Sequence, residues 1–111
     1  MTTNINNDVK QISCGMYHTV ILKNDGSLWS CGWNEDGQLG TGLDVSSSNK
    51  KSFTQVTTNT DNVKQISCGN NHTFIVKNDG SIWSCGYNYY GQLGLGTSDS
   101  HDTFVQVPSG I

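Results

Sequence analysis

The strongest constraint on this chain is that its sequence repeats. A shift of 54 positions places residues 9–42 on residues 63–96, and 25 of the 34 aligned positions carry the same residue. The match resumes at Phe53 and Phe104 with an offset of 51, because the second connecting loop is shorter. Self-similarity of this kind indicates a tandem array in which each repeat is one supersecondary unit that packs against its neighbour.

Composition argues against a helical fold for these repeats. Gly, Ser, Asn and Thr together account for 49 of the 111 residues, and the chain has no Ala and a single Pro, Pro108. The best helix former is therefore absent, and the abundant residues favour turns, caps and strands over helix interiors. We expect an all-β fold.

Each repeat is predicted to contain four short strands. In the first strand of the first repeat, a two-residue alternation places Ile12 and Cys14 on one face and Val9, Gln11 and Ser13 on the other. An apolar second strand, a third strand that contains a Trp, and a fourth strand after a polar loop complete the repeat.

The second and third strands of each repeat are predicted to form a hairpin. Asn-Asp-Gly stands between them at residues 24–26 and again at 78–80. This is a specific turn sequence, because Gly adopts a positive φ without a steric clash. Trp29 and Trp83, which follow in the third strands, are expected to fill the core.

Four antiparallel strands in about 50 residues, repeated in tandem, are typical of β-propeller blades. Three segments carry a more specific pattern: Val-x-x-Ile-x-Cys-Gly-x-x-His-Thr, then Asp-Gly-Ser-(Leu or Ile)-Trp, then Cys-Gly-x-Asn-x-x-Gly-Gln-Leu-Gly-x-Gly. Over both repeats this pattern resembles the repeat of the regulator of chromosome condensation family. We expect blades at residues 9–56 and 63–107 within a single propeller segment of residues 1–111.

The Gly-rich loops at residues 37–42 and 91–96 are not expected to bind phosphate. A phosphate loop needs a helix after its glycines and a Lys at a fixed place, whereas polar, non-helical residues follow these loops. We expect the glycines to allow tight backbone packing, and Leu39 and Leu93 to fill the space between blades.

No catalytic residue, cofactor or metal ion is predicted. His18 and His72 occupy equivalent repeat positions, and a residue fixed by a repeated architecture is more often structural than catalytic. Each repeat offers one His and two Cys without a Cys-x-x-Cys pair, whereas zinc sites usually take four ligands. The family resemblance implies that this His is a structural residue beside the blade core. The four Cys are expected to be reduced thiols, not the disulfides Cys14–Cys31 and Cys68–Cys85.

The differences between the repeats mark the expected binding surface. Nine aligned positions differ, and five of these change in chemical character. Four of the five lie in connections between strands, where rigid scaffolds usually carry recognition residues. Ordinary drift of surface loops is the alternative explanation. Because exposed aromatic rings beside polar groups are common contact anchors, the candidate partner-binding residues are Trp33, Glu35, Asp36, Tyr87, Tyr89 and Tyr90.

Two blades do not close a ring, because propellers contain about four to eight. The chain is therefore expected to form a homo-oligomer, with three copies giving six blades or four giving eight, or to be a fragment of a longer propeller. The predicted function is a non-enzymatic propeller module for protein–protein interaction, with a protein partner or copies of itself. Glycan or cell-surface recognition and nucleotide exchange on a small GTPase are the alternatives.

Charge and hydropathy argue against two classes of partner. The formal net charge is −3 and Arg is absent, so the clustered cations of a nucleic-acid surface are missing. No apolar run approaches the roughly 20 residues of a membrane span. With no signal peptide, a cytoplasmic location is expected, or a virion or cell surface if the chain belongs to a larger phage or adhesin protein. The Asn-, Ser- and Lys-rich composition favours a bacterial or phage source.

Overall fold

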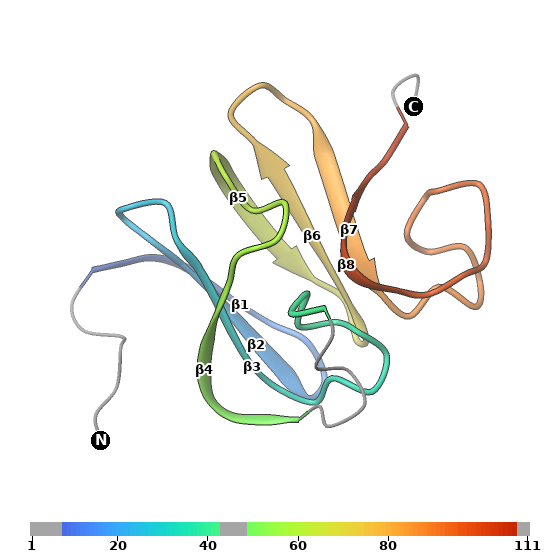
Figure 1. Cartoon of the computed structure of the whole chain (residues 1–111), viewed down its shortest axis with the longest axis horizontal. Coiled ribbons are helices and arrows are strands. Elements are labelled where there is room, and N and C mark those ends of the chain that lie inside the picture. The colour runs from blue at the N-terminus through green and yellow to red at the C-terminus, as the bar shows by residue number, and fades with distance from the viewer. Residues whose placement is uncertain (1–7, 43–48, 109–111) are drawn as a thin grey trace.

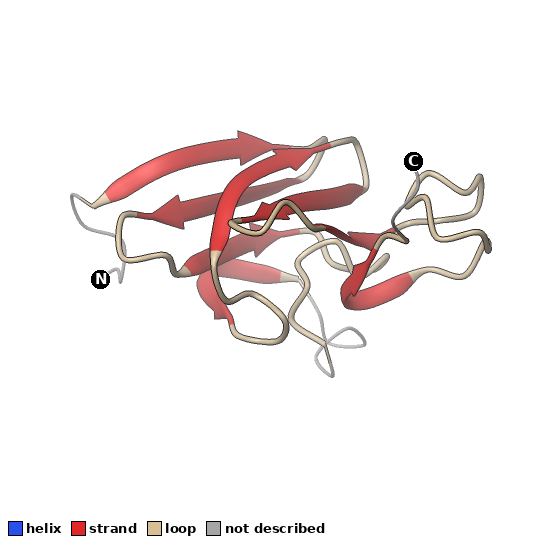
Figure 2. Ribbon diagram, turned by 90° about the horizontal axis from the view of Figure 1, so that it is seen from above, coloured by secondary structure: helices blue, strands red, loops and turns tan. Residues whose placement is uncertain are grey.

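The computed structural model describes residues 8–42 and 49–108. These residues form strands, turns and loops (Figure 2), and none of them belongs to a helix long and apolar enough to cross a bilayer. The strands are β1 (Val9–Cys14), β2 (His18–Lys23), β3 (Leu28–Gly32), β4 (Lys50–Val56), β5 (Val63–Cys68), β6 (His72–Lys77), β7 (Ile82–Gly86) and β8 (His101–Gln106).

The strands are arranged as two four-stranded antiparallel sheets in chain order, β1-β2-β3-β4 and β5-β6-β7-β8. The first sheet with its loops is called unit 1, and the second is called unit 2. The prediction of an all-β fold with two four-stranded repeats is confirmed. The two sheets lie side by side (Figure 1), and β5 contacts both β1 and β2.

The predicted hairpins are present, and a local hydrogen-bond network holds each turn. The Asp25 carboxylate accepts hydrogen bonds from Ser27 N and Ser27 Oγ, at 2.9 and 2.6 Å. Ser27 Oγ in turn accepts a hydrogen bond from Trp29 Nε1 at 2.9 Å. Gly26 has a φ of 91°, the left-handed conformation for which glycine is suited. The same contacts recur in the turn at residues 78–80.

A β-bulge changes the predicted faces of the first strand. Val9 lies opposite Lys23 in β2, and Ile12 lies opposite Ile21, with a register shift between Val9 and Gln11. Ile21 and Lys23 are two residues apart and point to the same side. Val9 therefore shares a face with Ile12 and not with Gln11, because the bulge inserts one extra residue into the alternation. β5 carries the same bulge.

Each unit has two faces that differ in composition. The face that carries Gln11 in unit 1 and Gln65 in unit 2 is called the front face. The opposite face, with Ile12 and Ile66, is called the back face. The front face of unit 1 packs against the back face of unit 2 and forms the hydrophobic core. The buried core residues are Val20, Leu22, Leu28 and Val56 from unit 1 and Val63, Ile66, Ile75, Cys85 and Phe104 from unit 2.

Leu93 and Trp29 depart from the expectations for core residues. Leu39 and Leu93 are both buried, at 1% and 0% exposure, although no further unit among the described residues covers the front face of unit 2. The burial of Leu93 therefore arises within its own unit. Ser84 Oγ donates to the Leu93 carbonyl at 3.0 Å, and Ser30 Oγ donates to the Leu39 carbonyl at 2.9 Å. Both tryptophans of the third strands are only half-buried: Trp83 packs against the core, whereas Trp29 lies on the opposite face of unit 1.

Candidate functional site

The junction between the units is held by side chains of unit 1 that bond to the backbone of unit 2. Gln11 Nε2 donates to the carbonyl of Ile66 at 3.0 Å, and Gln11 Oε1 accepts from the N–H of Ile66 at 3.1 Å. Ser13 Oγ accepts from the N–H of Cys68 at 3.0 Å. β5 is an edge strand of its sheet. These bonds satisfy backbone groups that would otherwise have no partner when the edge is covered.

His18 lies within the same junction and is 2% exposed. Its Nε2 is 2.9 Å from Thr73 Oγ1, and the Thr73 hydroxyl donates to the carbonyl of Gln38 at 2.7 Å. Since the single Thr73 proton is used there, His18 Nε2 carries the proton and donates. Burial, and to a lesser degree the nearby His72, lowers the pKa of His18 to about 4. This neutral, buried imidazole links β2 to β6 and, through Thr73, to the loop that carries Gln38.

The cysteines differ in environment but belong to no metal cluster among the described residues. All four are free thiols. Burial raises the pKa of Cys85 well above its usual value, so this thiol stays protonated. Throughout residues 8–42 and 49–108, no group of three or more His, Cys, Asp and Glu side chains is arranged to hold a metal ion.

Loops of both units meet above the junction around a pocket of about 350 Å³. Gly37 of unit 1 lies so close to β8 that an added Cβ would be 2.7 Å from both Asp102 Cα and the carbonyl oxygen of His101. Only glycine fits this approach, and its φ of 83° independently favours glycine. Desolvation and the adjacent Glu35 raise the pKa of Asp36. The residues that line this junction pocket are Glu35, Asp36, Gly37, Tyr87, Ser100, His101 and Asp102.

Three tyrosines form an aromatic cluster beside the junction pocket. The ring centroid of Tyr87 is 6.3 Å from those of Tyr89 and Tyr90, and the latter two meet edge to face at 4.8 Å. Tyr89 is 65% exposed and Tyr90 is 80% exposed. The loop is fixed from below, because Asn88 Oδ1 accepts from the N–H of Leu93 and Gln92 Oε1 accepts from the N–H of Tyr90. Two large aromatic rings are thus held in solvent by a rigid loop.

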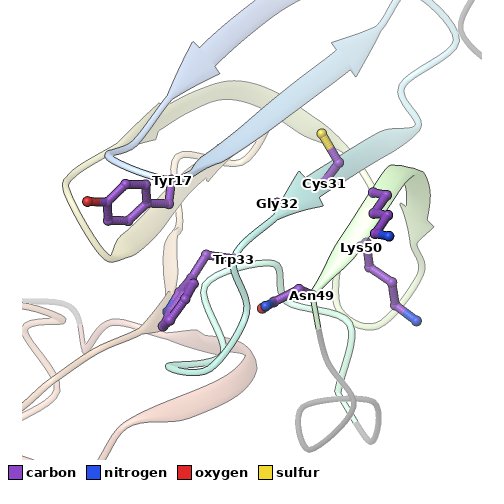
Figure 3. Close-up of a pocket in the computed structure, with 7 residues that line it drawn as sticks. Tyr17, Cys31, Gly32, Trp33, Asn49 and Lys50 are labelled. Atoms are coloured by element: carbon purple, nitrogen blue, oxygen red, sulfur yellow. The ribbon is translucent and has the colours of Figure 1, made fainter.

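Unit 1 has a corresponding pocket on its open side, of about 680 Å³. Figure 3 shows Tyr17 and Trp33 on one side of this pocket and Asn49 and Lys50 on the other. The Tyr17 and Trp33 rings are 6.1 Å apart, and Lys51 completes the lining with Cys31 and Gly32. This open pocket occupies the place in unit 1 that the junction pocket occupies in unit 2. Asn49 and Ser100 show the equivalence, because their side chains accept from the N–H groups of Asn34 and Asn88, respectively.

The structure gathers five of the six candidate residues in one place. Glu35, Asp36 and Tyr87 line the junction pocket, and Tyr89 and Tyr90 pack beside it. Trp33 lies apart, in the open pocket of unit 1. Whether these residues bind a partner stays a prediction. Sequence reasoning did not select the residues that precede or begin the fourth strands, namely Asn49, Lys50, Lys51, Ser100, His101 and Asp102.

Comparison with known proteins agrees with this architecture. One model of the regulator of chromosome condensation (RCC1) repeat matches residues 25–76 and 79–111, and a second matches residues 9–38 and 63–92. The X-linked retinitis pigmentosa GTPase regulator homolog of Caenorhabditis elegans is 39% identical over 100 residues, which are 90% of this chain and 7% of that protein. The secretion-regulating guanine nucleotide exchange factor of Bos taurus is 36% identical over 90 residues, 78% of this chain and 18% of that protein.

A solved structure gives the fold. The crystal structure of Prp20p from Saccharomyces cerevisiae, a protein described with its binding to Gsp1p and histones, superposes with a TM-score of 0.79 at 22% identity. The match covers 98% of this chain and 27% of Prp20p. This chain therefore spans a small part of each of these proteins, and it belongs to the RCC1 repeat family, with each of its two sheets built as one propeller blade.

Proposed function

We propose that the chain is a non-enzymatic protein-interaction module, with Tyr89 and Tyr90 at the centre of its contact surface. The observation that carries this proposal is the exposure of these two rings, 65% and 80%, on a loop whose backbone is bonded by the buried Asn88 and the half-buried Gln92. Aromatic residues gain much buried area on contact and lose little side-chain entropy, which is why they dominate the energetics of interfaces.

The surroundings of the two tyrosines support this proposal. The Tyr87 ring packs beside both of them, and Glu35 and Asp36 line the adjoining junction pocket. The surface thus combines aromatic rings with polar groups at its rim, as protein interfaces usually do. The names of the relatives, a GTPase regulator homolog and a guanine nucleotide exchange factor, agree with a protein partner.

Site-specific photocrosslinking tests the proposal. A photoreactive phenylalanine analogue in place of Tyr90 is expected to capture a specific protein. The same analogue in place of Asn24, an exposed residue of the first hairpin turn, is the matched control and is expected not to capture it. The captured protein is then purified and titrated against the wild-type chain and the Tyr89→Ser/Tyr90→Ser variant. We expect the variant to bind at least about tenfold more weakly, since each lost aromatic anchor costs more than about 1 kcal/mol.

Other results would contradict the proposal. Equal capture from both positions, or equal affinity of the two chains, would remove the tyrosines from the contact surface. Retention of the wild-type chain on a glycan array, lost in the variant, would favour glycan recognition. Faster nucleotide release from a purified small GTPase would favour the exchange alternative.

A further inference from the structure

The two outer faces of the chain are open and differ in burial from their covered counterparts. On the back face of unit 1, Ile12 is 58% exposed, whereas the equivalent Ile66 is 4% exposed against unit 1. Val9 is 38% exposed and its equivalent Val63 is 5% exposed. None of residues 8–42 and 49–108 covers the front face of unit 2 either, and its apolar residues Phe74, Val76 and Ile82 are only half-buried. Neighbouring apolar residues exposed in this way indicate a surface that another protein covers.

The hydrogen-bonding groups that hold the internal junction are present again on these outer faces. Gln65 is exposed and occupies the position of Gln11. Ser67 and His72 likewise occupy the positions of Ser13 and His18. At the opposite end of the chain, β1 is the edge strand of the first sheet, just as β5 is the edge strand of the second. The back face of unit 1 therefore presents an equivalent backbone edge. The front face of unit 2 therefore carries the side chains needed to bond to the β1 edge of a second copy.

The residues that differ between the units are concentrated where such a second copy would join. In the internal junction, Glu35 and Asp36 of unit 1 line the junction pocket together with Tyr87 of unit 2. Their equivalents on the outer faces are Tyr89 and Tyr90 on one side and the open pocket of Tyr17, Trp33, Lys50 and Lys51 on the other. Aromatic rings pack favourably with other rings and with Lys ammonium groups. The Tyr89–Tyr90 loop and the open pocket thus match each other in chemistry, although their residues differ from those of the Glu35–Asp36 loop and the junction pocket.

A glycine provides a further sign of an absent neighbour. Gly37 is needed in the internal junction because β8 of unit 2 leaves no room for a Cβ. Gly91 occupies the same position in unit 2 and has a φ of 75°, and no atom of the described residues lies within 4 Å of the place of its Cβ. If Gly91 lay against β4 of another copy as Gly37 lies against β8, the start of β4 would fill this space.

We infer that copies of this chain associate head to tail, with the front face of unit 2 on the back face of unit 1 of the next copy and the Tyr89–Tyr90 loop in the open pocket. This inference rests on the proposed function and names the partner of the tyrosine surface as a second copy. A head-to-tail contact forms a ring when its rotation closes. Because propellers hold about four to eight blades, closed rings contain two, three or four copies.

Light scattering during size-exclusion chromatography of the whole chain tests the inference. We expect a mass two, three or four times the 12.1 kDa of one chain. Ile12→Lys, on the back face of unit 1, and Tyr90→Lys, on the outer loop, are each expected to give the mass of a single chain. Both side chains are exposed within one copy, so the fold is retained and circular dichroism is unchanged. Asn24→Lys adds the same charge at an exposed turn residue and is expected to leave the assembly intact.

A mixture of the two variants identifies the head-to-tail arrangement. The Ile12→Lys chain keeps its outer loop, and the Tyr90→Lys chain keeps its back face, so one intact junction remains between them. We expect an equimolar mixture to contain a dimer of about 24 kDa, twice the mass of one chain. A mixture that stays at the mass of one chain would overturn the head-to-tail contact, and a wild-type chain that is monomeric and folded up to about 0.1 mM would overturn self-association. Specific capture of another protein from Tyr90 by a monomeric chain would still support the proposed function.

Discussion

Units 1 and 2 share most of their sequence, yet the same residues have different environments in them. Ile12 and Ile66 lie in identical Val-Lys-Gln-Ile-Ser-Cys strands, and one is 58% exposed whereas the other is 4% exposed. The difference comes from the neighbour: unit 1 covers the back face of unit 2, and nothing in the described part of the chain covers the back face of unit 1. In a repeat protein, burial is thus decided by the adjoining repeat as much as by the strand itself.

The largest test of this comparison is the same substitution at both positions. Ile66→Ala removes buried methyl groups from the core and is expected to lower the free energy of unfolding by about 3 to 4 kcal/mol. Ile12→Ala is expected to change it by less than about 0.5 kcal/mol, since the side chain is mostly in solvent. Urea unfolding of both variants, at concentrations where the chain is monomeric, measures the two effects. Equal losses would show that the units do not pack as described.

The next test uses pH, because His18 is buried and its equivalent His72 is only half-buried. The pKa of His18 falls from 6.5 to about 4 on folding. Below pH 6.5 the unfolded chain therefore binds a proton that the folded chain excludes, and stability decreases as the pH falls toward 4. We expect the free energy of unfolding to be about 2 kcal/mol lower at pH 5 than at pH 7.5. The His18→Gln variant, which keeps a donor for Thr73, should show a clearly smaller difference; an unchanged difference would assign the effect elsewhere.

A smaller effect is expected from the glutamines of the two first strands. Gln11→Ala removes two hydrogen bonds to the backbone of Ile66 and leaves a covered strand edge without its partners. We expect a loss of about 1 to 2 kcal/mol in the free energy of unfolding. Gln65→Ala changes an exposed residue and should have almost no effect in the monomer. Chemical denaturation of the two variants side by side decides this, and a larger loss for Gln65→Ala would reverse the assignment of front faces.

The smallest effect concerns the ion pair of unit 2. Lys77 Nζ lies 3.0 Å from Asp61 Oδ1, but the Asp61 side chain is 79% exposed. Exposed pairs contribute little because water and salt screen them. Asp61→Asn is therefore expected to leave the denaturation midpoint within experimental error, at low and at high salt. A clear, salt-dependent shift would show that this pair holds Lys77 against the Trp83 ring, 4.2 Å away.

Much of the fold followed from the sequence because local chemistry determines it. The Asn-Asp-Gly turns correctly predicted two hairpins, and the repeat correctly predicted four strands in each unit. The face of Val9 was predicted wrongly, because strict alternation assumes a strand without a bulge. The burial of Ile66 and the exposure of Ile12 were not predictable from their strands, which are identical.

The candidate site was predictable only in part. Comparing the repeats selected Tyr89 and Tyr90 because these positions differ in character. It did not select Lys51 or Asp102, because the loops before the fourth strands differ in length and were not aligned. Tyr17 was visible as a difference between the repeats. Its proximity to Trp33 depends on the pairing of β2 with β3 and became evident only in the fold.

The thiols of the two units differ in exposure, so their reactivity toward an alkylating reagent reports whether each sheet is covered. Cys14 is exposed on the back face of unit 1, whereas Cys85 is fully buried in unit 2 with a strongly raised pKa. Since alkylating reagents attack the accessible thiolate, iodoacetamide will label Cys14 of an isolated chain and spare Cys85. Loss of labelling at Cys14 would then measure how often the open sheet is occupied, in the unmodified protein and without any substitution.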